Sequence, residues 1–110
     1  MAQYDLEIYK LKAELCKTFA DPKRLIIINQ LREGETTVNE LARVIELPQA
    51  VVSRHLAILR DKGVVQHRRE GTSVYYSLSN PKIGETCDMM HQILLDQVEK
   101  SKQLAERLVA

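Results

Sequence analysis

The feature that most constrains the fold is a pair of helical patterns in the middle of the chain, joined by only a few residues. The first is predicted to start after Thr37, which can cap a helix, with Glu40 placed three residues further on as in a capping box. Its apolar residues recur on one helix face, at Val38, Leu41, Ala42 and Ile45. Leu47 and Pro48 end this helix and open a second one that extends toward Gly63. So short a connection predicts a helix-turn-helix unit.

The second helix of this pair has a polar side of unusual composition. Its apolar arc holds Val51, Val52, His55, Leu56, Ile58 and Leu59. The opposite arc holds Gln49, Ala50, Ser53, Arg54, Ala57, Arg60 and Asp61. A side that meets only solvent is usually rich in charged residues, whereas Ala50, Ser53 and Ala57 are small. This side is therefore predicted to let the helix backbone approach another molecule closely.

Two further helices are predicted before this unit. The first covers about Asp5–Phe19, and the second covers about Pro22–Glu33. Asp21 is placed to cap the second of these helices, and Gly34 stands just beyond its end.

After Gly63 the period of the sequence changes from helical to alternating. Strands are predicted over Val64–Arg69 and Val74–Ser79, with Gly71 in the turn between them. Asn80 and Pro81 then open a long helix that runs through about Leu108. The predicted fold is mainly α with a small β-hairpin, in the order four helices, two strands and a last helix, which is that of a winged helix-turn-helix domain.

The terminal helices carry more apolar surface than a small domain can cover. With 110 residues, the chain is predicted to form one domain over residues 1–110. The first helix has two apolar stripes, and the last has one band along its whole length, which includes Ile83, Cys87, Met90, Leu94, Val98, Ala105 and Leu108. The first and last helices are therefore expected to hold a homodimer together.

Such a domain presents the polar side of its second paired helix to the major groove of double-stranded DNA, where Gln, Ser and Arg reach base edges. The hairpin tip is expected to contact phosphates or the minor groove. The predicted DNA-contacting residues are Gln49, Ala50, Ser53, Arg54, Arg60, Arg68, Arg69 and Thr72.

Net charge alone does not indicate a nucleic-acid-binding protein, because it is only +1. Positive charge is instead local, since residues 54–70 contain Arg54, Arg60, Lys62, Arg68 and Arg69 against the two acids Asp61 and Glu70. An ordinary solvated helix end and hairpin is the alternative explanation of this segment.

The sequence also excludes several classes of protein. No apolar run approaches the roughly 20 residues of a membrane span, and the N-terminus lacks the layout of a signal peptide, so a cytoplasmic protein without a membrane partner is expected. No nucleophile with a base, paired carboxylates or glycine-rich phosphate loop can be assembled, so an enzyme is not expected. A winged-helix module for protein interaction, without an effector, is the alternative function. The arginines near the hairpin argue against it.

Several motifs together resemble the ArsR-type (ArsR/SmtB) winged-helix repressors. The matching stretches are FADPKRLIII, TTVNELARVIELPQAVVSRHLAILRDKGVV and HRREGTSVYYSLSNP, so the resemblance covers nearly the whole chain. It implies a symmetric homodimer that binds a palindromic operator and releases it when a ligand or a thiol modification intervenes.

The metal positions of that family are vacant here. Its arsenic, lead and cadmium sensors open the third helix with Cys-Val-Cys-Asp-Leu, where this chain has Thr37 through Leu41. Its zinc and nickel sensors use Asp and His early in the last helix, with further His about ten residues on. Here the early positions are Ser79, Asn80 and Lys82, and the later stretch LLDQVEK has no His.

Cys16, Cys87 and His91 remain as candidate sensing residues. Cys87 and His91 are four residues apart and share a helix face, and Cys16 lies on the first helix. The thiols suit redox or persulfide chemistry, and with His91 they suit a soft metal or metalloid ion as effector, although no cofactor is required. The alternative is that both cysteines are apolar residues of the dimer core.

The two histidines in and after the helix-turn-helix unit are predicted to lie in different environments. His55 falls inside the apolar arc of its helix and is expected to pack within the domain. His67, on the first predicted strand, is expected to face solvent or a phosphate.

Overall fold

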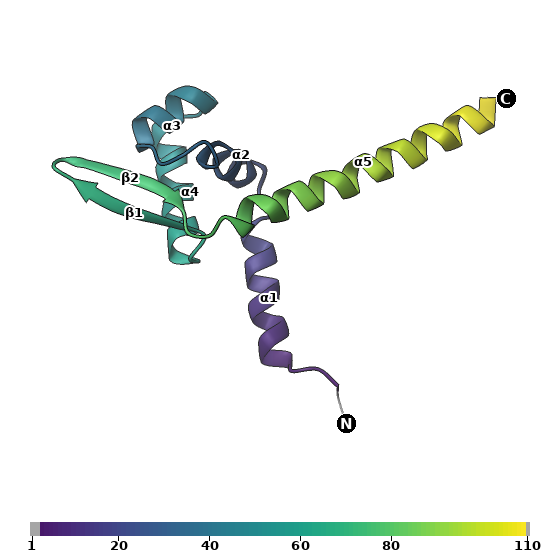
Figure 1. The fold of residues 1–110 in the computed structure, drawn as a ribbon, viewed down its shortest axis with the longest axis horizontal. Coiled ribbons are helices and arrows are strands. Elements are labelled where there is room, and N and C mark those ends of the chain that lie inside the picture. The colour runs from purple at the N-terminus through teal and green to yellow at the C-terminus, as the bar shows by residue number, and fades with distance from the viewer. Residues whose placement is uncertain (1–2, 110) are drawn as a thin grey trace.

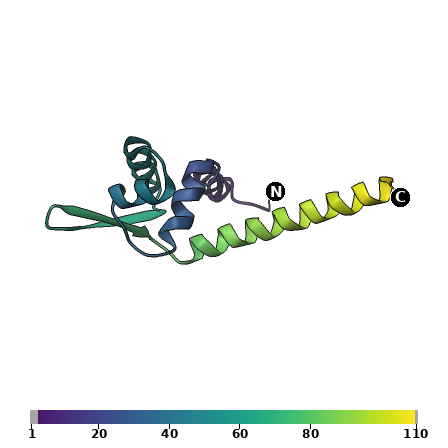
Figure 2. The same ribbon diagram turned by 90° about the horizontal axis from the view of Figure 1, so that it is seen from above.

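The computed structural model describes residues 3–109 and consists of five helices and one hairpin in that range. The elements are α1 (Leu6–Thr18), α2 (Pro22–Leu31), α3 (Val38–Ile45), α4 (Gln49–Asp61), β1 (Val65–Glu70), β2 (Ser73–Leu78) and α5 (Lys82–Val109). Helices α2 to α4 and the hairpin gather into one body, which we call the head, and α1 and α5 project from it in different directions (Figure 1). We call these two helices the arms. Figure 2 shows that the hairpin and α5 point away from the head on opposite sides.

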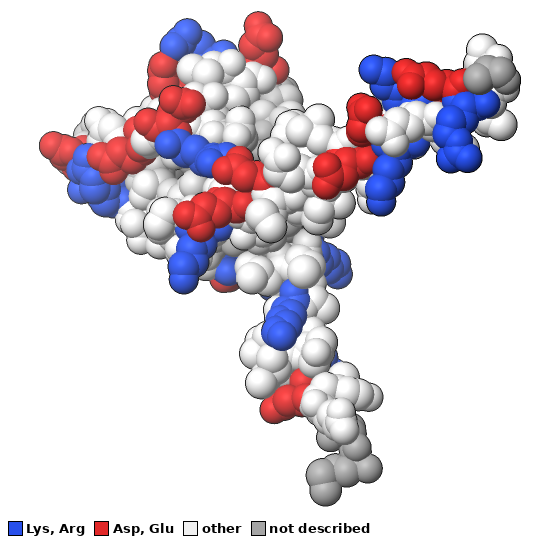
Figure 3. Space-filling model, turned by 45° about the vertical axis from the view of Figure 1, so that its right-hand side comes forward, with Lys and Arg blue, Asp and Glu red and all other residues white. Residues whose placement is uncertain are grey.

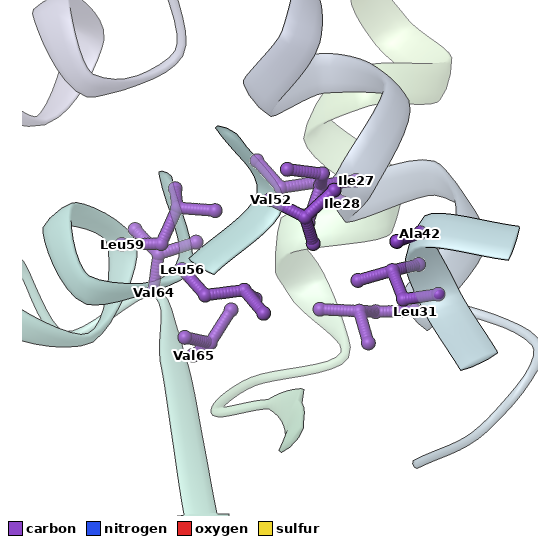
Figure 4. Close-up of a cluster of buried hydrophobic side chains, with 10 residues drawn as sticks. Ile27, Ile28, Leu31, Ala42, Val52, Leu56, Leu59, Val64 and Val65 are labelled. Carbon is purple, nitrogen blue, oxygen red and sulfur yellow. The ribbon is translucent and has the colours of Figure 1, made fainter. Parts of the chain in front are cut away.

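The core lies in the head alone. Its ten buried apolar residues come from α2, α3, α4 and the start of the hairpin (Figure 4). They are Ile27, Ile28, Leu31, Leu41, Ala42, Val52, Leu56, Leu59, Val64 and Val65. The two helices of the predicted helix-turn-helix unit, α3 and α4, thus pack on α2, which confirms the predicted winged helix-turn-helix order.

Side-chain caps fix the helix starts as predicted from the sequence. The Asp21 carboxylate accepts hydrogen bonds from the backbone of Lys23 at 2.8 Å and Arg24 at 3.3 Å. The Thr37 hydroxyl accepts one from the Glu40 backbone at 3.2 Å. The reciprocal half of the predicted capping box is replaced, because the Glu40 carboxylate accepts hydrogen bonds from Arg43 instead, at 3.1 and 2.5 Å.

Several predicted boundaries were wrong by one or two residues, among them those of the second strand, which covers Ser73–Leu78 rather than Val74–Ser79. Helix α2 ends at Leu31 rather than Glu33, and Arg32 caps it. The first strand begins at Val65 rather than Val64, because the Val64 backbone N–H donates to Leu59 in the last turn of α4 at 2.8 Å. The hairpin then pairs in antiparallel register from Val65 with Leu78 to Glu70 with Ser73.

A backbone bridge joins the hairpin to the segment before α3. Thr36 and Tyr76 exchange both backbone hydrogen bonds, at 3.0 and 2.8 Å. The hairpin, called the wing below, is therefore fixed to the beginning of the helix-turn-helix unit rather than attached only through α4.

The arms leave their apolar side chains in solvent. In α1 the exposed large apolar residues are Leu6, Ile8, Tyr9, Leu11 and Leu15. In α5 they are Met89, Met90, Ile93, Leu94, Leu95, Val98, Leu104, Leu108 and Val109. No helix of the described residues is long and apolar enough to cross a membrane.

Candidate DNA interface

Helix α4 has one buried side and one exposed side, divided as its sequence predicts. Val52, Leu56 and Leu59 have no exposed surface, and His55 is 4% exposed. The predicted DNA-contacting residues of this helix are all exposed: Gln49, Ala50, Ser53, Arg54 and Arg60. The small side chains of Ala50 and Ser53 line a shallow hollow with Val38 and Gln49. A flat surface of this kind allows close contact with the floor of a groove.

Helices α3 and α4 of the helix-turn-helix unit contact each other through side chains at their exposed edge. The Gln49 amide nitrogen donates to the side-chain oxygen of Asn39 on α3. Glu46 between the helices adopts the left-handed conformation, with φ of 56°, and the following Leu47 backbone donates to Ala42 at 3.2 Å. The angle between α3 and α4 is therefore held by both backbone and side-chain contacts.

His55 is a packed residue, as predicted, and not a base-reading one. Its Nδ1 accepts a hydrogen bond from Arg24 Nε at 3.3 Å, and Arg24 Nη1 also donates to the Thr18 carbonyl at 3.3 Å. Burial lowers the pKa of His55 below its ordinary value. The neutral imidazole thus joins α4 to α2 and, through Arg24, to the end of α1.

In the wing, Arg68 is held by acidic residues of the same chain. Its guanidinium donates to Glu35 at 2.5 to 3.1 Å and to Glu70 at 2.7 Å, and it lies over the Tyr75 ring at 4.7 Å. These hydrogen bonds raise the pKa of Arg68, and the bond from Arg68 lowers the pKa of Glu35. Part of the positive charge predicted for the hairpin tip is therefore already neutralised.

The other predicted DNA-contacting cations are free within residues 3–109. Arg54, Arg60 and Arg69 make no ion pair there, and Thr72 is exposed beside the turn. His67 is exposed, as predicted, and stacks on Tyr76 with ring centroids 5.9 Å apart. In the view of Figure 3, acidic and basic side chains alternate over the head, so charge is mixed on that face.

The three candidate sensing residues are not assembled within one chain. Cys16 is exposed near the end of α1, Cys87 is half-buried against the core, and His91 is exposed. Among residues 3–109, no three His, Cys, Asp or Glu side chains form a group that could hold a metal ion. Within one chain α1 and α5 diverge after they leave the head (Figure 1), so the predicted metal site of Cys16, Cys87 and His91 stays a prediction that depends on a second subunit.

The surroundings of the two thiols differ. Cys16 lines a cavity of about 340 Å³ between the end of α1 and the start of α5, together with Phe19 and Ile83. Burial raises the pKa of the Cys87 thiol. The Cys87 thiol therefore ionises less readily than an ordinary cysteine, so a smaller fraction of it is thiolate at neutral pH.

Sequence patterns missed the long-range polar contacts that hold these parts in place. They are the hydrogen bonds from Arg24 to His55, from Arg68 to Glu35 and from Arg32 to Asp88. Their partners are 31, 33 and 56 residues apart, and no local spacing rule connects residues at such separations.

Together, the buried helix-turn-helix, the exposed small-residue side of α4 and the bridged hairpin define a winged helix-turn-helix domain of the DNA-binding type. The sequence profile of the bacterial regulatory protein, arsR family, matches residues 21–67, which cover α2, α3, α4 and the start of β1.

Known proteins agree in sequence and in structure. The transcriptional repressor PagR of Bacillus anthracis is 39% identical over 82 residues, which are 74% of this chain and 82% of PagR. The crystal structure of Rv0081 of Mycobacterium tuberculosis superposes with a TM-score of 0.77 at 36% identity, covering 84% of this chain and 94% of that one. The solution structure of the homodimeric DNA-binding domain of Mb0332 from Mycobacterium bovis has a TM-score of 0.74 at 26% identity, covering 88% and 89%.

This chain belongs to the ArsR family of bacterial transcriptional regulators. The family consists of DNA-binding regulators rather than enzymes, in agreement with the prediction from the sequence.

Proposed function

We propose that this protein is a homodimeric repressor that binds a palindromic operator and reads its bases with the exposed side of α4. The observation that carries the proposal is the division of α4, in which Val52, Leu56 and Leu59 have no exposed surface while the opposite side lies in solvent, with Gln49, Ala50, Ser53 and Arg54. Small and hydrogen-bonding residues on a projecting helix suit the edges of bases in a major groove.

The same division assigns roles to individual residues. Ser53 and Arg54 contact bases or lie next to them, and Gln49 and Ala50 at the start of α4 lie against the groove. Arg60, Arg69 and Thr72 contact the DNA backbone, as does Arg68 once it exchanges Glu35 for a phosphate.

The arms are proposed to form the dimer interface. Leu94 is 56% exposed and Val98 is 58% exposed, and Leu11 on α1 is 71% exposed, which is unusual for residues so apolar. The related domain of Mb0332 is homodimeric, which supports a second copy of this chain as the partner that covers both arms.

Release from the operator is proposed to follow a change at Cys16 and Cys87. Oxidation would join two thiols in a disulfide within or between subunits, with loss of two protons and two electrons to the oxidant, which for diamide becomes the corresponding hydrazine. Polysulfide would instead transfer one sulfur atom to a thiolate, which gives a persulfide and releases a polysulfide shorter by one sulfur. A soft metal ion would bind the thiolates, with His91 as a further ligand across the dimer.

DNA binding is tested by selecting fragments from the source genome with the purified protein and measuring their affinity by fluorescence anisotropy. The expected result is a palindromic sequence bound about 10³-fold or more tightly than random DNA of equal length. Equal affinity for selected and random DNA would exclude an operator-specific repressor.

Release is tested on the same operator with diamide, polysulfide or Cd²⁺. Affinity is expected to fall in the parent protein and to remain unchanged in Cys16→Ser and in Cys87→Ser. If the double Ser variant responds as the parent does, the cysteines are structural residues.

A further inference from the structure

The long helix α5 is attached to the head over a short length. Of its described residues, only Ile83, Gly84 and Cys87 are buried or half-buried, and every residue from Asp88 to Val109 is exposed. The angle at which α5 leaves the head must therefore be set within its first two turns.

One ion pair spans this attachment. Arg32, which caps the end of α2, donates from Nη1 to Asp88 Oδ1 at 2.7 Å and from Nη2 to Asp88 Oδ2 at 2.9 Å. Two parallel hydrogen bonds between planar groups fix orientation as well as distance, which a single ion pair does not. These hydrogen bonds lower the pKa of Asp88 and raise the pKa of Arg32, so both groups stay charged over a wide pH range.

Gly84 makes room for this contact. A Cβ atom at residue 84 would lie 2.4 Å from Arg32 Nε and 3.0 Å from Arg32 Cδ and Cζ. The Arg32 side chain therefore lies directly on the backbone of α5 at Gly84 and reaches Asp88 one turn further along the same face. Glycine within a helix is normally unfavourable, so a close approach of this kind is the physical reason for it here.

A small change of angle at this point has a large effect further along. A rotation of roughly 10° displaces a point about 20 Å along the helix by roughly 3.5 Å, which is close to the rise of one base pair. If α5 joins the two subunits, its angle to each head sets the distance between the two α4 helices.

We propose that Arg32, Gly84 and Asp88 form a clasp that fixes the angle between α5 and the head and so determines which spacing of operator half-sites the dimer accepts. This inference rests on the proposed dimeric, operator-binding function. The three residues are positioning residues, since none of them lies on the reading side of α4.

Asp88→Asn and Gly84→Ala test the clasp by different means. The first keeps the shape of the side chain and removes its charge, and the second pushes the Arg32 guanidinium off the helix backbone. Gly84→Ala is informative because its two expected effects are opposite. Alanine stabilises an isolated helix relative to glycine, yet at this position it is expected to impair the clasp. Glu85→Gln and Asp96→Asn are the matched controls, since each removes one charge from an exposed residue of α5 that has no ion pair within residues 3–109.

The measurement is affinity for a set of duplexes whose half-sites are moved apart or together by one and two base pairs. In the parent and in both controls, affinity is expected to peak at one spacing. In Asp88→Asn and Gly84→Ala, affinity at that spacing should fall by about tenfold, the scale of one mismatched base pair, and the profile should flatten. Affinity for a single half-site should stay the same, because the reading surface is intact.

Circular dichroism and sedimentation show whether each variant remains a folded dimer. Arg32→Lys, which keeps the charge and loses the paired hydrogen bonds, serves if a variant does not fold, and it should flatten the profile in the same way. An unchanged profile in folded variants overturns the clasp. A parent protein with no spacing optimum overturns the proposed function instead.

Discussion

The head and the arms of this molecule differ in the exposure of their apolar residues. The head covers its apolar residues itself, so that Ile27, Ile28 and Leu56 have no exposed surface. The arms carry apolar residues along their length and leave them in solvent, as with Leu94 at 56% exposed. The core of the head is thus complete within one chain, whereas the apolar surface of the arms is the surface that the proposed second subunit would cover.

The largest expected effect comes from placing charge on an arm. Leu94→Glu combined with Val98→Glu would bury two carboxylates per subunit in the proposed interface, at a cost of several kcal/mol each unless the dimer separates. We expect a monomer in sedimentation velocity, with the helix-turn-helix still folded by circular dichroism. A folded dimer of unchanged mass would show that the interface lies elsewhere.

The matching change in the head is Leu56→Ala. Loss of a fully buried leucine is expected to lower the free energy of unfolding by about 2 to 5 kcal/mol, measured by urea denaturation. Leu104→Ala, at a residue 55% exposed, is the control and should have a much smaller effect on the head. Equal losses from the two changes would contradict the division between head and arms.

Comparing Arg54→Ala with Arg69→Ala tests which residues of the head contact bases and which contact the DNA backbone. Arg54→Ala is expected to cost about 1 to 3 kcal/mol of operator affinity and to relax sequence preference. Arg69→Ala should weaken binding to all sequences alike and reduce the slope of affinity against salt by about one. If both changes weaken specific and random DNA equally, the assigned division between base and backbone contacts is wrong.

The smallest expected effect concerns the pH dependence of the head. Burial lowers the pKa of His55 in the folded protein, so the unfolded chain binds the proton more readily, and stability must fall as pH drops below the ordinary histidine pKa of about 6.5. The slope contributed by this one group is at most about 1.4 kcal/mol per pH unit. We expect urea denaturation between pH 7 and pH 5 to show this loss in the parent and less of it in His55→Gln.

A matched substitution controls for the general effect of losing a histidine. His91→Gln removes an exposed imidazole from α5 and serves as that control, so the effect assigned to His55 is the part that His55→Gln loses and His91→Gln keeps. The same dependence in His55→Gln as in the parent would mean that other groups cause it.

Local patterns in the sequence were enough for the helices, the hairpin and the two sides of α4. Caps such as Asp21 and Thr37 act over three residues, and the burial of Val52, His55 and Leu56 follows from helical period alone. Such features depend on neighbours in the chain, and this is why the sequence was sufficient to predict them.

Contacts between distant elements could not be predicted in the same way. The bidentate contact of Arg32 with Asp88 depends on how α5 crosses the end of α2, and the engagement of Arg68 by Glu35 depends on where the hairpin lies. The divergence of α1 from α5 likewise leaves the described residues of one chain without a group of three possible metal ligands, although both helices were predicted from the sequence.

The backbone bridge between Thr36 and Tyr76 has a consequence for the thermodynamics of binding. Because it fixes the wing to the start of the reading unit, the chain need not order the base of the hairpin when DNA arrives. The entropic cost of arranging both contact surfaces is met during folding, so less of it opposes association. Binding by this domain should therefore resemble the docking of a rigid body, with little change in backbone order at residues 36 and 76 between the free and bound protein.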